Sequence, residues 1–185
     1  MFMPGRAAAL SDTDVAKPPV LSAAEVGYPP FSIVTEKGRA GGFSVELMTA
    51  ALAAMGREVT FRTGSWSEVK SWLERGEVEA LPLVGRTPER EVAFDFTVPY
   101  MSLHGAIVVR AGTDDIRSLT DLTGRRVAVM KGDNAEEFLQ REDRGISIHT
   151  TDSFNEALKE LSRGKHDAVV IQRLVALRLI YAEGL

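Results

Sequence analysis

The 185-residue sequence predicts an α/β fold of two lobes with mostly parallel sheets. Three observations lead to this fold class. Short apolar segments alternate along the chain with helical stretches, as in strand–helix–strand units. Helix-capping residues stand in front of most of the helical stretches. One capped helix and the strand that follows it occur twice, once in each half of the chain.

The first half of the chain contains three predicted helices. Apolar residues recur at helical spacing from residue 43 to 54, and Gly56 stands where a glycine ends a helix. Ser65 with Glu68 forms a capping box in front of the second helix, which runs to residue 75. Thr87 followed by Pro88 caps a short third helix. The predicted strands of this half are 20–26, 31–34, 59–61 and 80–84.

Strands and helices keep alternating in the second half. Asp133 with Glu136, and Ser153 with Glu156, stand as capping residues at the start of two helices. The predicted strands of this half are 106–110, 127–130, 146–149 and 168–171, and the predicted helices are 133–141, one that begins at 153, and 174–181. Residues 100–105 are expected to cross between the two halves.

The repeated unit indicates two similar lobes built in series. Ser65-Trp66-Ser67-Glu68-Val69 corresponds to Ser153-Phe154-Asn155-Glu156-Ala157, and each helix is followed by a glycine and a strand. We therefore place lobe 1 at 20–102 and lobe 2 at 103–185. Residues 1–19 are expected to be either a disordered leader or the remnant of a secretory signal peptide. Their Ala-rich stretch resembles the cleavage region of a signal peptide, but the apolar region that precedes such a cleavage region is missing.

Composition excludes several classes of protein. The chain has 22 Lys and Arg against 26 Asp and Glu, a net charge of −4, and no basic run of the kind that binds nucleic acid. It has no cysteine, which excludes disulfides and thiol chemistry, and its three histidines lack metal-binding spacing. No nucleophile elbow, phosphate loop or membrane-spanning apolar stretch occurs. We therefore expect no cofactor, no metal, no nucleic-acid partner and no catalytic residue.

Two facing α/β lobes predict a ligand cleft at the ends of the strands and the starts of the helices. Arg90 lies one turn into the helix that Thr87 caps, where a guanidinium can hold a carboxylate. The alternative is a solvated arginine paired with Glu89 or Glu91. As a surface residue of the cleft, Arg90 is expected to tolerate replacement by alanine at a cost of about 1 kcal/mol or less in stability.

Aromatic and acidic residues accompany Arg90 in the predicted cleft. Tyr28 and Trp66 offer flat faces to a ligand, and the alternative is that both are core aromatics packed beside Phe31 and Val69. Asp133 is expected to cap its helix rather than to contact a ligand.

Several segments occur together in a recognisable order. They are Gly27-Tyr28-Pro29-Pro30-Phe31, Gly41-Gly42-Phe43-Ser44-Val45-Glu46-Leu47, Trp66, Thr87-Pro88-Glu89-Arg90, Phe94-Asp95-Phe96-Thr97-Val98-Pro99-Tyr100, residues 121–129 (DLTGRRVAV) and Gly164-Lys165-His166-Asp167-Ala168. As a set spanning 20–185, they resemble the family 3 extracellular solute-binding proteins, periplasmic-binding-protein-like (type II) proteins of amino-acid type. The resemblance implies that Arg90 grips a ligand α-carboxylate and that Tyr28 and Trp66 line the pocket.

The sequence departs from that family at several candidate ligand-binding positions. Leu83 and Gly85 replace the small hydroxyl residue that usually precedes the arginine. Asp133 and Asn134 stand where the family has Gly-Thr, and the neutral Gln172 stands where the family has the carboxylate that binds the ligand ammonium. A standard α-amino acid ligand is therefore in question.

These departures resemble the binding-protein modules fused to membrane-bound sensor histidine kinases. We therefore predict an extracytoplasmic sensor domain that closes on an anionic or amino-acid-like solute, is tethered to the inner membrane in the full-length protein, and has a downstream signalling domain as partner. The chain is expected to be a fragment with lobe 2 incomplete. One alternative is the binding protein of an ABC-type amino-acid transporter. Another is a family-related dehydratase, for which Glu46 and Glu79 are the candidate acids.

Overall fold

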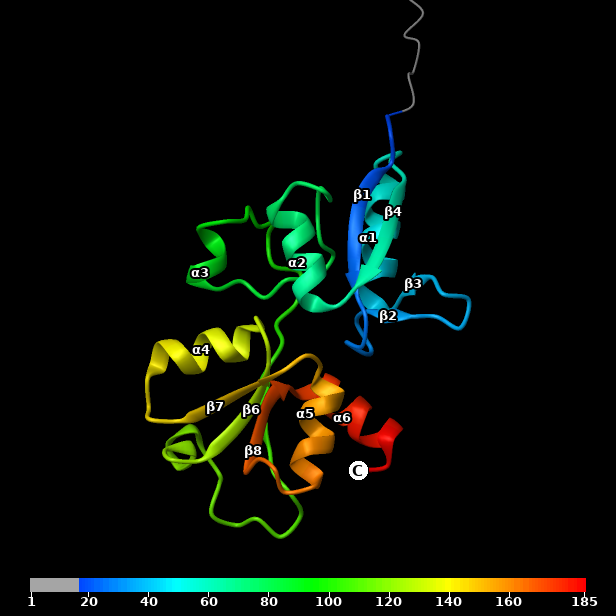
Figure 1. The fold of residues 1–185 in the computed structure, drawn as a ribbon. Helices are drawn as coiled ribbons and strands as arrows, with labels where there is room; N and C mark the ends of the chain where they lie inside the picture. The colour runs from blue at the N-terminus through cyan, green and yellow to red at the C-terminus, as the bar shows by residue number, and fades with distance from the viewer. Residues whose placement is uncertain (1–16) are drawn as a thin grey trace, which may run out of the picture.

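The computed structural model describes residues 17–185, which form two lobes joined by an extended segment (Figure 1). Most of the leader or signal-peptide remnant expected at 1–19 lies outside these described residues. Within residues 17–185, no helix has both the length and the apolar character needed to cross a membrane.

Lobe 1 contains a parallel strand pair, a short hairpin and three helices. Its elements are β1 (Val20–Glu25), β2 (Ile33–Val34), β3 (Ala40–Gly41), α1 (Phe43–Ala54), β4 (Val59–Gly64), α2 (Trp66–Glu74) and α3 (Pro88–Glu91). Strands β1 and β4 run parallel, with Val20 opposite Val59. The predicted capping box is present, because Ser65 accepts from the backbone N–H of Glu68 and the Glu68 carboxylate accepts from that of Ser65.

The predicted strand at 80–84 is wrong. Only Ala80 takes part in a β-bridge, with Ser22 of β1, and residues 81–84 run on as extended chain without ladder pairing. Pro82 lies in the middle of this segment and has no N–H to donate, so a central strand cannot form through it. The segment instead continues from the bridge at Ala80 to the start of α3 at Pro88.

Lobe 2 contains a four-stranded sheet with the order β5-β8-β6-β7. Its elements are β5 (Gly105–Val108), a 3-10 turn at Leu119–Leu122, β6 (Arg126–Met130), α4 (Asn134–Glu142), β7 (Ser147–Thr151), α5 (Phe154–Ser162), β8 (Ala168–Gln172) and α6 (Arg173–Glu183). Strand β6 pairs parallel with β7 and β8, and β5 pairs antiparallel with β8. The predicted strands and helices of this half are therefore all confirmed, with ends shifted by one or two residues.

The buried apolar residues form two hydrophobic clusters, and one of them joins the lobes. The larger cluster draws residues from both lobes, including Trp66 and Val69 of α2 and Phe154 of α5. The smaller cluster lies within lobe 2 alone and includes Leu122 and Leu139, both fully buried. Lobe 2 therefore has a core of its own, whereas the core of lobe 1 continues into lobe 2.

Candidate functional site

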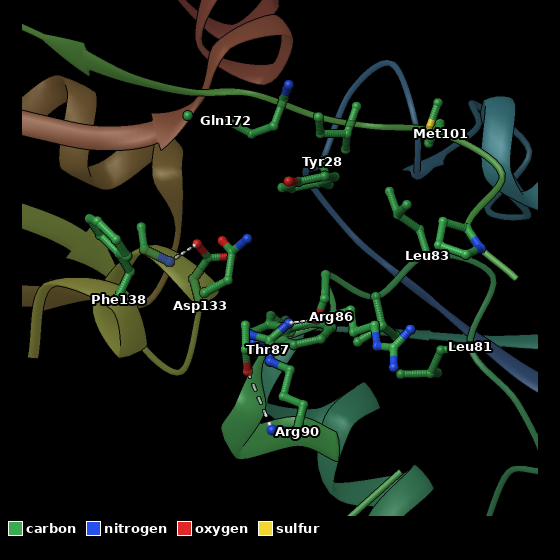
Figure 2. Close-up of a pocket in the computed structure, with 18 of the residues that line it drawn as sticks. Tyr28, Leu81, Leu83, Arg86, Thr87, Arg90, Met101, Asp133, Phe138 and Gln172 are labelled. Carbon is green, nitrogen blue, oxygen red and sulfur yellow. Dashed lines mark hydrogen bonds between the residues drawn. The ribbon is translucent and has the colours of Figure 1, made fainter. Parts of the chain in front are cut away.

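A cavity of about 1170 Å³ lies between the two lobes. Its walls come from β1, the 80–90 segment and α3 of lobe 1, from the start of α4 and the end of β8 in lobe 2, and from the crossing chain. All seven residues predicted as ligand-binding line it, namely Tyr28, Trp66, Gly85, Arg90, Asp133, Asn134 and Gln172. Figure 2 shows Arg90 and Thr87 on one side of the cavity, Asp133 and Gln172 on the other, and Tyr28 between them.

The start of α3 holds the backbone of Arg90. The Thr87 hydroxyl accepts from the backbone N–H of Arg90 at 3.3 Å, and a proline fills the first helical position. Arg90 is only 3% exposed, so the alternative of a solvated arginine is wrong. Its acidic neighbours pair elsewhere, because Glu89 binds Arg141 and Glu91 binds Arg86.

The guanidinium of Arg90 reaches from lobe 1 to lobe 2. Its Nε donates to the carboxylate of Glu137 at 3.0 Å, Nη1 donates to the carbonyl of Gly85 at 3.2 Å, and Nη2 donates to the carbonyl of Gly132 at 3.1 Å. A guanidinium carries five N–H groups. One N–H on Nη1 and one on Nη2 are therefore left for a further acceptor in the cavity.

Trp66 belongs to both the core and the cleft. Its side chain packs into the larger hydrophobic cluster and is 6% exposed, as the core alternative predicted. Its indole Nε1 also donates to the carbonyl of Gly132 across the cleft at 2.6 Å, and the Arg90 guanidinium lies 4.9 Å from the ring centre. Trp66 is therefore both a core residue and a lining residue of the cavity, and its contact with a ligand stays a prediction.

Tyr28 likewise packs on the core while facing the cavity. Its ring centre lies 6.0 Å from those of Phe31 in lobe 1 and Phe154 in lobe 2. The pKa of the Tyr28 phenol is raised above its usual value, mainly because the phenol is buried. The hydroxyl therefore stays protonated and can donate a hydrogen bond to an acceptor in the cavity.

The start of α4 brings Asp133 and Asn134 to the lobe 2 wall. Asp133 caps the helix, as predicted, with Oδ2 accepting from the backbone N–H of Ala135 at 2.9 Å. Burial raises the pKa of the Asp133 carboxyl above its usual range. Asn134 approaches lobe 1 so closely that a Cβ at Gly85 would lie 3.0 Å from its Nδ2. A glycine at 85 therefore lets the two walls meet.

Gln172 is committed in part to the backbone. Its Oε1 accepts from the N–H of Val175 at 2.9 Å and so caps α6, while Nε2 donates to the carbonyl of His104 at 3.4 Å. The side-chain amide has two N–H groups. One N–H of Gln172 is therefore left over at the cavity wall.

Two site carboxylates were missed by sequence reasoning. Glu25 ends β1 and lines the cavity, and burial raises its pKa to about 8, with nearby Asp133 adding to the rise and Arg90 opposing it. Its signal was an acidic residue at the carboxyl end of an otherwise apolar strand, where such sheets bind ligands. Glu137 lies on α4 and contacts Arg90, but nothing in its local sequence distinguishes it from a solvated helix residue.

The two acids considered for a dehydratase lie in different places. Glu79 lines the cavity, but its Oε2 accepts from the backbone N–H of Leu21 at 2.7 Å. Glu46 is exposed in the first turn of α1 and is not among the lining residues. Among residues 17–185, no three His, Asp or Glu side chains come together as a metal site.

Two α/β lobes around a cleft with a buried arginine in its wall define the class of bilobed solute-binding proteins. Residues 20–168 match the bacterial extracellular solute-binding proteins of family 3, and the chain belongs to that family.

Known relatives and solved structures agree with this assignment. The L-cystine-binding protein TcyJ of Escherichia coli K12 is 30% identical over 155 residues, which are 83% of this chain and 58% of TcyJ. The ABC transporter arginine-binding protein 1 of the same organism is 27% identical over 143 residues, 77% of this chain and 58% of the relative. The chain therefore spans a little over half the length of these relatives, which are amino-acid-binding proteins.

Solved structures share the fold, among them the following three. An ancestral arginine-binding protein bound to arginine has a TM-score of 0.82 at 31% identity, over 91% of this chain and 76% of that one. A histidine kinase sensor domain with similarity to periplasmic binding proteins has a TM-score of 0.84 at 30% identity, over 89% and 72%. An ancestral amino acid-binding protein, AncCDT-1, a precursor of cyclohexadienyl dehydratase, has a TM-score of 0.78 at 29% identity, over 89% and 74%.

Proposed function

We propose that this chain binds an amino-acid-like zwitterion in the cleft between its lobes and serves as an extracytoplasmic sensor module. One observation carries the proposal. The guanidinium of Arg90 is buried in the wall of a cavity whose opposite wall holds an acidic side chain, Asp133. This pairing of one cation and one acid across a cleft suits a ligand that carries a carboxylate and an ammonium group.

The remaining donors of the site fit a ligand carboxylate. The two free N–H groups of Arg90, on Nη1 and Nη2, can form a bidentate pair with it. The phenol of Tyr28 and the free amide N–H of Gln172 are further donors on the cavity wall.

The acidic residues of the cavity fit a ligand cation. Asp133 uses one carboxylate oxygen as a helix cap and keeps the other. Glu25 lines the same cavity and adds a second acidic group to it. A positive group beside either carboxyl would favour its ionised form and lower its pKa. Glu25 and Asp133 therefore compensate for the neutral Gln172 at the position where the family has a carboxylate.

Closure of the lobes would be the output of the module. Arg90 and Asp133 lie on different lobes, so a ligand that contacts both binds the closed form better than the open form. The shift toward the closed form can be no larger than that difference in affinity. In the sensor interpretation, closure is passed to a signalling domain through a segment that tethers the module to the inner membrane.

A thermal-shift screen of amino acids, small organic acids and polyamines, followed by calorimetry, tests the binding proposal. Arg90→Met should abolish binding of every carboxylate ligand found. Arg75→Met is the matched control, since Arg75 lies on the same lobe outside the cavity and pairs with Glu77. Equal affinities in Arg90→Met and in the unaltered chain would remove Arg90 from the site.

The sensor and transporter interpretations differ in what accompanies the chain. The likeness to a histidine kinase sensor domain supports the first, and the curated relatives, which are named as binding proteins, support a free-standing component of an ABC-type transporter. The complete gene distinguishes them. A membrane span followed by a kinase-type domain supports the sensor, and a signal peptide on a free-standing binding protein beside permease genes supports the transporter.

A dehydratase is the second candidate, because Glu25 is a carboxyl with a pKa of about 8 in the cavity wall. Such a group can act as a general acid near neutral pH. Incubation with prephenate or arogenate should give no turnover if the chain is a binding module. Turnover that disappears in Glu25→Gln would establish the enzyme instead.

A further inference from the structure

One carboxylate of lobe 2 is held by three side chains of lobe 1. Glu137, on α4, accepts from the hydroxyl of Thr87 at 2.9 Å and from Nε of Arg90 at 3.0 Å, and the ammonium of Lys70 lies 3.7 Å away. The side chain of Glu137 is only 14% exposed. A second pair between the lobes, Arg141 with Glu89, lies further out and is about 40% exposed on both sides.

The position of Glu137 matters because its carboxylate accepts a hydrogen bond from Arg90, as a ligand carboxylate would. Its oxygen sits on the Nε side of the Arg90 guanidinium, and the carbonyls of Gly85 and Gly132 take one N–H each of the other two nitrogens. A ligand carboxylate therefore has only the two remaining N–H groups available, unless it displaces Glu137. Whatever binds there also meets the negative charge that Glu137 keeps close to Arg90.

We infer that Glu137 is a specificity-determining residue, an internal carboxylate that competes with the ligand for Arg90 and joins the two lobes. The inference rests on the proposed binding of an amino-acid-like ligand. A second carboxylate on the ligand meets the negative charge of Glu137 and finds only acidic side chains, Asp133 and Glu25, on the nearby walls, whereas a cationic side chain would favour the ionised form of both. The site therefore favours ligands with one carboxylate and a positive group over dicarboxylates.

Calorimetric titration with L-arginine and L-glutamate tests this selectivity. The unaltered chain should bind L-arginine more tightly than L-glutamate. Glu137→Gln keeps the shape of the side chain and removes its charge, so the ratio of the two affinities should fall at least tenfold in favour of L-glutamate. Glu142→Gln is the matched control, because Glu142 lies on the same helix and pairs within lobe 2, with Arg144. An unchanged ratio in Glu137→Gln would overturn the inference.

Distances between the lobes test the role of Glu137 without any ligand. The chain has no cysteine, so Met55→Cys in lobe 1 and Thr150→Cys in lobe 2, both exposed, introduce two unique sites for spin labels. Glu137→Gln should lengthen and broaden the measured distance, and Lys70→Gln should do so to a smaller extent. Glu142→Gln should leave the distance unchanged.

The two measurements separate the inference from the proposed function. Where binding is measurable, the affinity ratio decides the inference. If no variant binds either amino acid, the proposed function fails for these ligands, and the distance between the lobes then decides whether Glu137 joins them. A distance in Glu137→Gln equal to that of the unaltered chain would, in that case, show that Glu137 has no such role.

Discussion

The two lobes share a repeated helical unit but differ in how they are stabilised. Lobe 2 has a four-stranded sheet and a hydrophobic cluster of its own. Lobe 1 has one parallel strand pair extended by a single bridge at Ala80, and its buried apolar residues belong to a cluster that continues into lobe 2. The repeated unit, which begins at Ser65 in lobe 1 and at Ser153 in lobe 2, therefore packs against a different sheet in each lobe.

This difference shows how the site is assembled. Lobe 2 supplies Asp133 and Gln172 from helix starts that follow strands of the four-stranded sheet. Lobe 1 supplies Gly85 and Arg90 from a segment without sheet pairing. The bonds of Arg90 to Gly132 and Glu137 hold that segment against lobe 2. Ordering of the lobe 1 wall is thus coupled to contact with lobe 2.

The largest expected effect distinguishes the two cores. Leu122→Ala, in the cluster private to lobe 2, should lower the free energy of unfolding by about 4 kcal/mol, as for other fully buried leucines. The folded fraction should keep its ligand affinity.

Trp66→Ala should cost about 3 kcal/mol and also weaken binding, since Trp66 contacts Gly132 and Arg90. Urea denaturation and calorimetry measure both, and unchanged affinity in Trp66→Ala would assign that side chain to the core alone.

Arg90→Ala should have the next largest effect on stability. The expectation from sequence, a loss of about 1 kcal/mol or less, assumed a surface residue and is revised because Arg90 is 3% exposed. Its removal leaves the Glu137 carboxylate with Thr87 and Lys70 alone. A loss of about 3 kcal/mol follows from breaking one side of a buried ion pair. In Arg90→Ala/Glu137→Gln the loss should be smaller than in the single variant, and equal losses would contradict the pairing.

The pH dependence of stability should have opposite signs in the two lobes. The pKa of Glu25 in lobe 1 is raised from 4.5 to about 8, so its contribution to stability is lost as the pH rises through that window. The pKa of Asp167 in lobe 2 is lowered from 3.8 to about 2 by Arg126, so its contribution is lost as the pH falls through that window. The midpoint of urea unfolding should depend less on pH on the alkaline side in Glu25→Gln, and less on the acid side in Asp167→Asn. A slope unchanged in Glu25→Gln would contradict its burial as an acid.

The smallest expected effect tests the equivalence of the repeated unit. Ser65→Ala and Ser153→Ala each remove the side-chain acceptor at a helix start and should each cost about 1 kcal/mol. The Glu68 carboxylate also accepts from Ser65, which Ser153 does not match with Glu156. Ser65→Ala should therefore be slightly the more costly. The reverse order would indicate that the surroundings of the helix outweigh its cap.

Local signals in the sequence predicted most of the fold. Capping residues such as Ser65, Thr87, Asp133 and Ser153 each mark a helix start that the structure contains. The prediction failed at 80–84, where the apolar character of the segment was given more weight than the missing N–H of Pro82.

The site was predicted less completely, for a physical reason. Six of the seven candidates stand at strand ends and helix starts, Gln172 came from the resemblance to the family, and all seven line the cavity. The contact between Arg90 and Glu137 depends on how two lobes face each other, which no local pattern encodes. Glu25 was missed because it falls inside the predicted strand 20–26, and only the loop that follows this strand was considered for the cleft.

The hydrogen bond between Trp66 and Gly132 makes intrinsic tryptophan fluorescence a probe of the contact between the lobes. The chain has two tryptophans, and both lie on α2. Trp66 touches lobe 2 through its indole, whereas Trp72 lies under the guanidinium of Arg62 within lobe 1. Separation of the lobes would expose one indole to water and leave the other as a constant background, so intrinsic fluorescence follows opening and closing without a label.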